Sequence, residues 1–176
     1  VAAGNSARIV TFTGRELLEM TRGATLMLNP NDGGAVLYPE EIESLLTTGT
    51  IVQVRKDPWT GGPIWFGSPD RQPSWLIPVL TRTLTQQSSV TSAYLIQTAT
   101  AANPEAVSLL IVLGVTSGQA ERAARACLTS MQPEIQRSPP DLAIDLTVFD
   151  PAQGQPDFVS ASGVEPFYWR EQARVD

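Results

Sequence analysis

The chain has 176 residues, of which 42% are hydrophobic and 17% are charged, so it can bury the core of one domain or of a domain with a smaller appendage. Its net charge of −6 at pH 7 offers little for the phosphate neutralisation that supplies most nucleic-acid affinity, and we expect no nucleic-acid partner. Histidine is absent and Cys127 is the single cysteine. We therefore expect no metal site, no cofactor, no internal disulfide and no Ser-His or Cys-His catalysis.

Membrane insertion is not expected either. The longest apolar runs, such as Leu109–Val115, are far shorter than the roughly 20 residues that cross a bilayer. The N-terminus lacks the charged-then-apolar pattern of a signal peptide, so a cytoplasmic protein is expected. Because the chain begins with Val1 rather than methionine, a processed start and a fragment of a longer protein both stay open.

Residues 1–56 are expected to fold as strand, helix, strand, helix and strand. The alternation of Ala7–Thr13 predicts the first strand, and the segment GRELLEMTRG that follows has the spacing of a short amphipathic helix ending at Gly23. Leu26–Leu28 predict the second strand. This strand runs into turn-forming residues at Asn29–Gly34, so the chain must reverse there.

The second helix of this part is predicted between Pro39, which suits a first helical turn, and Gly49, which ends it. Acidic residues gather at its start, where the positive end of the helix dipole favours them, and we interpret them as structural rather than as a metal or acid–base cluster. These residues are Glu40, Glu41 and Glu43. Ile51–Val54 then predict a short strand.

The composition changes beyond this point. Residues 57–73 are rich in proline, glycine and tryptophan, as is typical of a linker, and Ile64–Gly67 within them predict a short strand. Trp59, Trp65 and Trp75 either form a recognition surface, because tryptophan is enriched at binding hot spots, or pack between two modules.

Residues 74–176 form the second module, whose pattern is more regular. The predicted elements are a helix over Trp75–Leu84, strands over Thr91–Thr98 and Val107–Val115 joined by a turn near Asn103-Pro104, a helix over Ala120–Met131 with Cys127 on its apolar stripe, and a strand over Leu142–Phe149. With Ile64–Gly67 included, this order is typical of the ferredoxin-like split β-α-β fold. The expected class is α+β: a four-stranded antiparallel sheet with two helices on one face, preceded by a smaller α/β segment.

The third strand of that fold is central, and here both of its alternating faces are apolar. Two helices cover one face only, so the other face needs a second cover. The tail of residues 163–172 contains Phe167, Tyr168 and Trp169 in a row, and these large aromatics are candidates for that cover, either within the chain or across an interface. In an extended segment, Phe167 and Trp169 are expected on one side and Tyr168 on the other.

Several short motifs together resemble the enhanced serine sensitivity (SseB) protein family. They are Arg22-Gly23, Leu28-Asn29-Pro30, Pro39-Glu40-Glu41-Ile42 and Glu165-Pro166-Phe167-Tyr168. The resemblance implies a bacterial protein in which residues 1–56 are the last part of an N-terminal SseB domain and residues 74–176 are the C-terminal domain with its aromatic tail. Family members often carry a lysine in the loop that here spans residues 31–38, and this chain has none there. The family is named for a phenotype, so the resemblance implies no reaction and no catalytic residues.

These observations favour a non-catalytic protein-interaction protein, an adaptor or an inhibitor-like partner, which binds another protein or a second copy of itself. Its candidate interaction surface comprises Asn29, Pro30, Trp59, Trp65, Phe167, Tyr168 and Trp169. The alternative is a regulator that binds a small molecule, with an amino acid suggested by the family name. A hydrolase or transferase that works with carboxylates alone comes last, because no convincing pair of carboxylates is present.

Overall fold

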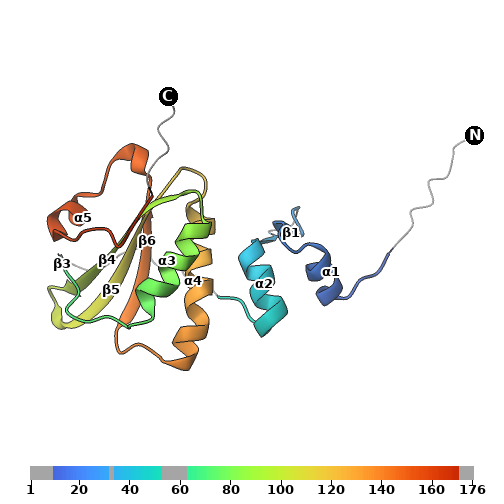
Figure 1. Ribbon diagram of the computed structural model, residues 1–176, viewed down its shortest axis with the longest axis horizontal. Coiled ribbons are helices and arrows are strands. Elements are labelled where there is room, and N and C mark those ends of the chain that lie inside the picture. The colour runs from blue at the N-terminus through green and yellow to red at the C-terminus, as the bar shows by residue number, and fades with distance from the viewer. Residues whose placement is uncertain (1–9, 32–33, 53–62, 171–176) are drawn as a thin grey trace, which may run out of the picture. The chain divides into compact units, whose positions relative to one another are not determined.

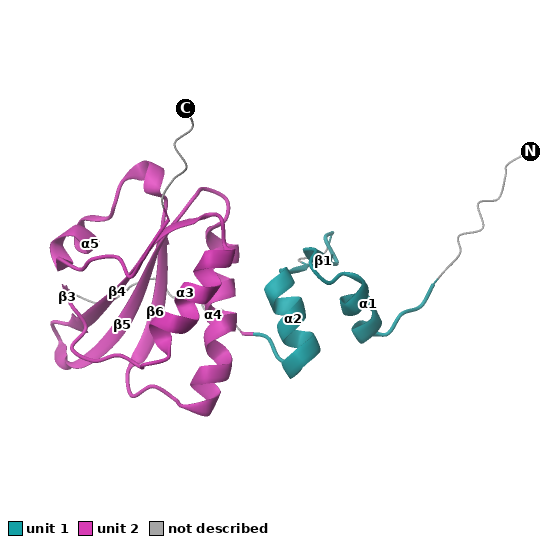
Figure 2. Ribbon diagram, in the orientation of Figure 1, with its two compact units in different colours: residues 1–51 teal, residues 52–176 magenta. Residues whose placement is uncertain are grey.

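The computed structural model describes residues 10–31, 34–52 and 63–170. The chain divides into two compact units, residues 1–51 and residues 52–176 (Figure 2). The first unit contains α1 (Gly14–Met20), β1 (Leu26–Leu28), β2 (Ala35–Leu37) and α2 (Pro39–Thr48). No helix in the described ranges combines the length and the apolar character that crossing a bilayer requires.

The predicted strand over Ala7–Thr13 is wrong for the part that the structure describes. Residues 10–13 are not in a strand, and Thr13 instead caps α1: its side chain accepts from the Glu16 N–H at 3.2 Å, and Glu16 accepts from the Thr13 N–H at 2.7 Å. This reciprocal cap satisfies amides that the first helical turn leaves open. The local capping chemistry therefore outweighs the alternating pattern.

The predicted reversal after Leu28 is confirmed, because β1 and β2 pair as antiparallel strands with Leu26 opposite Leu37. The second helix is confirmed as α2. It ends at Gly49, whose φ of 75° is a left-handed conformation that glycine adopts at little cost. The short strand predicted at Ile51–Val54 is not present at Ile51 and Val52, and the rest of it lies outside the described residues.

The second unit contains a mixed, five-stranded sheet with helices. Its elements are β3 (Ile64–Gly67), α3 (Leu76–Gln86), β4 (Val90–Thr100), β5 (Asn103–Val115), α4 (Ala120–Arg137), β6 (Ala143–Phe149), the 3-10 turn η1 (Pro151–Gln153), α5 (Asp157–Ser162) and β7 (Tyr168–Trp169). The turn between β4 and β5 lies at residues 101–102 rather than at Asn103-Pro104. Pro104 falls where the pairing of the two strands is irregular, and there its missing N–H costs little.

The strand order differs from the ferredoxin-like prediction. The order is β3-β4-β5-β6, with β7 also paired to β4, and β6 runs parallel to β5 rather than antiparallel. The connection through α4 returns the chain to the same end of the sheet, so β5 and β6 run parallel. β6 pairs with the side of β5 that β4 leaves free. The strand predicted to be central, β5, does lie inside the sheet, between β4 and β6. β3 lies at the edge, where its four residues and its largely exposed Trp65 are well placed.

The main core lies between the sheet and the pair of helices α3 and α4, which lie together on one side of the sheet in Figure 1. Leu76, Leu80 and Leu84 of α3 are fully buried there, and Cys127 of α4 is also in this core. The sheet contributes Ala93, Leu95, Leu109, Ile111 and Leu113. We call this set the helix-side cluster.

The opposite face of the sheet is also covered, as the two-faced apolar pattern of β5 requires. A second cluster there contains Tyr94, Ile96 and Val112 of the sheet together with Val159 of α5. Phe158 of α5 stacks on Phe66 of β3 with ring centroids 4.9 Å apart. Figure 1 shows α5 on the side of the sheet away from α3 and α4. We call this set the second-face cluster, and its cover is α5 rather than the aromatic tail.

Candidate functional site

The aromatic tail is built into the sheet as an added edge strand. The Phe167 N–H donates to the Ala93 carbonyl and the Arg170 N–H to the Thr91 carbonyl, both at 2.9 Å. Tyr168 lies opposite Ala93 and Trp169 lies opposite Ser92. The tail therefore occupies part of the outer edge of β4, where its backbone groups replace water.

Arg170 holds the tail to the C-terminal end of α3. Its Nη2 donates to the carbonyls of Leu84 and Gln87 at 3.0 and 3.2 Å, and its Nε donates to the Val90 carbonyl at 3.1 Å. The last carbonyls of a helix lack intrahelical donors and carry the negative end of its dipole, so a guanidinium is well suited to them. Nη2 also donates to the Tyr168 hydroxyl at 2.7 Å. Nη2 has two hydrogens and more than two acceptors, so some of these acceptors share one hydrogen.

The predicted sides of the three aromatic residues are partly wrong. Phe167 and Tyr168 are both half-buried and pack against the helix-side cluster, whereas Trp169 is 64% exposed. Only Tyr168 and Trp169 lie in a strand, so the alternation does not extend back to Phe167. Phe167 and Tyr168 are thus occupied within the fold.

Trp65 is the other exposed tryptophan among the residues of this unit that the structure describes. It is 67% exposed and lies in β3 opposite Ala99 of β4. Its neighbour Phe66 packs in the second-face cluster, so strand alternation places Trp65 on the helix side of the sheet. Tyr168 packs on the helix side, and the same argument places Trp169 on the second face. The two tryptophans therefore share one edge of β4 but project from opposite faces.

The remaining candidate residues are not brought to this edge by any described contact. Asn29 and Pro30 are exposed in the β1–β2 turn of the first unit, where Asn29 adopts a left-handed φ of 48°. Asparagine tolerates this conformation better than most residues, which fits a tight reversal. Trp59 lies outside the described residues.

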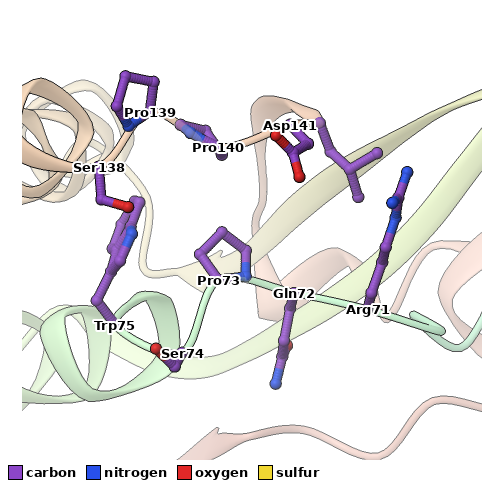
Figure 3. A pocket seen from close by; sticks show the side chains of 10 residues that line it. Arg71, Gln72, Pro73, Ser74, Trp75, Ser138, Pro139, Pro140 and Asp141 are labelled. Carbon is purple, nitrogen blue, oxygen red and sulfur yellow. The ribbon is translucent and has the colours of Figure 1, made fainter.

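A cavity of about 300 Å³ lies between the segment that enters α3 and the segment that joins α4 to β6 (Figure 3). Trp75 and the buried Leu142 are among its apolar lining residues, and Pro139 and Pro140 lie along one side. In Figure 3 the Arg71 side chain extends toward the segment that carries Asp141, whose carboxylate points into the gap. An opening of this size, with one cation and one anion, suits a small polar ligand.

The other titratable groups have structural surroundings. Burial raises the pKa of the Cys127 thiol to about 12, so the thiolate is disfavoured at neutral pH and the residue belongs to the core, as expected. Glu41 accepts from the Tyr38 N–H at 2.9 Å, and Glu43 pairs with Arg22 at 3.4 Å. In the described ranges, no group of His, Cys, Asp and Glu side chains is arranged to hold a metal ion.

A comparison with family models matches residues 59–170 to the SseB protein C-terminal domain. This chain belongs to the SseB family. The match begins at residue 59, near the start of the predicted linker, and ends at Arg170, so the sheet, both helical covers and the tail fall within the SseB C-terminal domain. No curated protein and no solved structure matches the chain. The assignment of residues 1–56 to an N-terminal SseB domain stays a prediction.

Two features of this SseB C-terminal domain were not predicted from the sequence. Arg170 follows Trp169 directly, and the only available signal was a cation next to an aromatic run, which does not indicate which helix end it reaches. The cavity of Figure 3 joins residues 71–75 to residues 138–142. These segments become neighbours only through the packing of α3 on α4, so local patterns contain no sign of them.

Proposed function

We propose that this SseB-family chain is a non-catalytic protein-interaction module, acting as an adaptor or an inhibitor-like partner in the bacterial cytoplasm. Trp65 and Trp169 at the outer edge of β4 are its main contact residues. The proposed partner is another protein, and no nucleic acid, membrane or cofactor is required.

The observation that carries this proposal is the exposure of the two tryptophans. Among the described residues of the second unit, they are the large hydrophobic side chains that stay mostly in water, at 67% and 64% exposed. An aromatic side chain buries roughly 150–250 Å², which at about 25 cal/mol per Å² leaves each tryptophan on the order of 3 kcal/mol to gain from a partner. Tryptophan is also the residue type most enriched at binding hot spots.

The chemistry of the chain supports a binding role over a catalytic one. The chain has no histidine, and the raised pKa of Cys127 keeps its thiol protonated. Catalytic groups are usually activated by a neighbouring base or by a lowered pKa. Cys127 has no histidine to act as its base, and its pKa is raised rather than lowered, so neither kind of activation favours it as a nucleophile.

Binding measurements with tryptophan variants test the proposal. After capture of partners from the native cell, the affinity of each captured protein is compared for the unchanged chain, Trp65→Ala and Trp169→Ala. We expect at least one variant to weaken binding by roughly tenfold or more, the loss that removal of a hot-spot side chain produces. The exposed Arg82→Ala of α3 serves as the control. Equal affinity for the unchanged chain and both tryptophan variants would refute the proposal.

The cavity of Figure 3 favours a second candidate function, the binding of a small zwitterion such as a free amino acid. Arg71 is suited to bind a carboxylate and Asp141 an ammonium group, while Trp75 and the prolines provide an apolar wall. Both charged residues line the same cavity, so a carboxylate and an ammonium group each have an oppositely charged side chain there. The name of the family suggests the same class of ligand.

A thermal-shift series with free amino acids tests this second candidate. A ligand that binds the folded state alone stabilises it by RT ln(1 + [L]/Kd), about 2.7 kcal/mol at one hundred times Kd. We expect one amino acid to raise the melting temperature with increasing concentration, and we expect Arg71→Ala and Asp141→Ala to abolish that rise. A flat response across the series, or a rise that both variants retain, counts against the cavity as the site.

A further inference from the structure

β6 is an edge strand whose outer side has no strand partner among the described residues. It is seven residues long and pairs with β5 along its whole length, from Ala143 to Phe149, without a register shift. Natural proteins protect such edges with lysine, proline or a bulge. The sequence AIDLTVF contains no lysine or proline, and the pairing contains no bulge. Its outward backbone N–H and C=O groups are therefore ready to pair with another strand.

The helix-side face of this edge is apolar and incompletely buried. Ile144, Leu146 and Val148 are half-buried, whereas their partners on β5 are fully buried. Leu128 and Ile135 of α4 are also half-buried and pack against the same cluster. An apolar border therefore runs along β6 and the adjoining face of α4, and a second strand and helix would cover it.

The order of side chains along β6 makes the strand complementary to itself. If two copies pair as antiparallel strands about a twofold axis at Leu146, the opposed pairs are Leu146–Leu146, Ile144–Val148, Asp145–Thr147 and Ala143–Phe149. The pairs Leu146–Leu146 and Ile144–Val148 fall on the helix side, and Ala143–Phe149 falls on the second face. The one charge of the strand, Asp145, lies opposite a hydroxyl donor. Such cross-strand pairs contribute roughly 0.2–1 kcal/mol each.

Neighbouring registers are poorer. A twofold axis at Asp145 places two carboxylates directly opposite each other, and like charges at that distance are unfavourable. An axis at Thr147 places Asp145 opposite Phe149. An axis between two residues opposes side chains from different faces, which a continuous sheet does not allow.

We propose that the chain forms a twofold dimer in which the β6 strands of two copies pair as antiparallel neighbours centred on Leu146. The two five-stranded sheets then become one continuous sheet, and the α4 helices of both copies lie on the same face. Leu128 and Ile135 lie beside the interface between the two copies, where their side chains become less exposed to water. This interface is separate from the tryptophan edge at β4, so either surface can fail its test without the other.

Charge variants at position 147 test the register. Thr147→Asp places a carboxylate opposite Asp145 twice in each dimer, whereas Thr147→Lys places an ammonium group there. In sedimentation velocity on the full chain across a concentration series, we expect Thr147→Asp to weaken the dimer by about tenfold or more and Thr147→Lys to leave it intact. The double variant Asp145→Lys with Thr147→Asp restores opposite charges and is expected to restore the dimer.

A measurement without any substitution guards against variants that fail to fold. Amide hydrogen exchange of the unchanged chain is compared at low and high protein concentration, and we expect exchange in β6 to slow as concentration rises while β3 stays unchanged. A chain that is monomeric at every soluble concentration overturns the proposal. So does an equal loss of the dimer in both single variants, or a failure of the double variant to restore it.

Discussion

Replacing Arg170 with alanine is expected to lower the free energy of unfolding by about 2–3 kcal/mol, the effect of losing hydrogen bonds from a charged donor to partly buried acceptors. The Arg170 guanidinium donates to carbonyls at and beyond the end of α3 and to the Tyr168 hydroxyl. Without it, those carbonyls lose a charged donor at the negative end of the helix dipole. Urea denaturation of the full chain, followed by circular dichroism, measures the change.

Two control variants test whether the stabilisation comes from the hydrogen-bond donors of the Arg170 guanidinium, rather than from its positive charge or from the neighbouring tail residue. Arg170→Lys keeps the charge but presents a compact ammonium group, so we expect it to recover only part of the loss. Trp169→Ala removes a side chain that is 64% exposed, and we expect it to change stability by less than about 0.5 kcal/mol. If Arg170→Ala unfolds at the same urea concentration as the unchanged chain, Arg170 does not stabilise the end of α3.

Replacing Val159 with aspartate is expected to cost about 3–5 kcal/mol, because it leaves an unpaired charge inside the second-face cluster. Val159 is 1% exposed and packs with Tyr94, Ile96 and Val112 of the sheet. A loss of that size is a large share of the 5–15 kcal/mol that holds a typical domain. Thermal unfolding of the full chain is the measurement, with a melting temperature expected to fall by many degrees.

The matched control is Ser160→Asp, which places the same charge on the next residue of α5, where the side chain is exposed. We expect it to leave the melting temperature almost unchanged. Similar melting temperatures for the two aspartate variants would show that α5 does not lie against the sheet.

The sequence was most informative where one apolar face repeats over several turns. The stripe from Ala123 to Met131 predicted α4, and the alternation from Leu142 to Phe149 predicted β6, because burial of one face imposes the period of the element. The two-faced apolar character of β5 also predicted a cover on both sides of the sheet. These features depend on the element itself and not on its neighbours.

Strand order was not predictable from the same patterns. The alternating pattern of a strand indicates which of its faces is buried, but it does not indicate which strand is its neighbour. The pattern of β6 is therefore equally compatible with either edge of the sheet. The helix α5 was also missed, because six residues are too few to show a helical period. At Thr13 the alternating pattern predicted a strand, but the capping hydrogen bonds of this one polar side chain begin the helix α1 there instead.

For the candidate site, the sequence identified residue types but not their placement. Trp65 and Trp169 were singled out as large aromatic residues and both are exposed, yet only the strand register shows that they project from opposite faces. Phe167 and Tyr168 were grouped with them, and the structure places both against the core. Arg71 and Asp141 were not considered, since they line one cavity only because α3 and α4 pack together.

In this structure α5 closes the second face of the sheet within a single chain. Nuclear Overhauser contacts between methyl groups test it most directly, in the full chain at a concentration where it is monomeric. We predict contacts between the Val159 methyl groups and those of Ile96 and Val112. Methyl groups of Ile96 and Val112 that show no contact with Val159, and instead contact Trp169 or water, would contradict it.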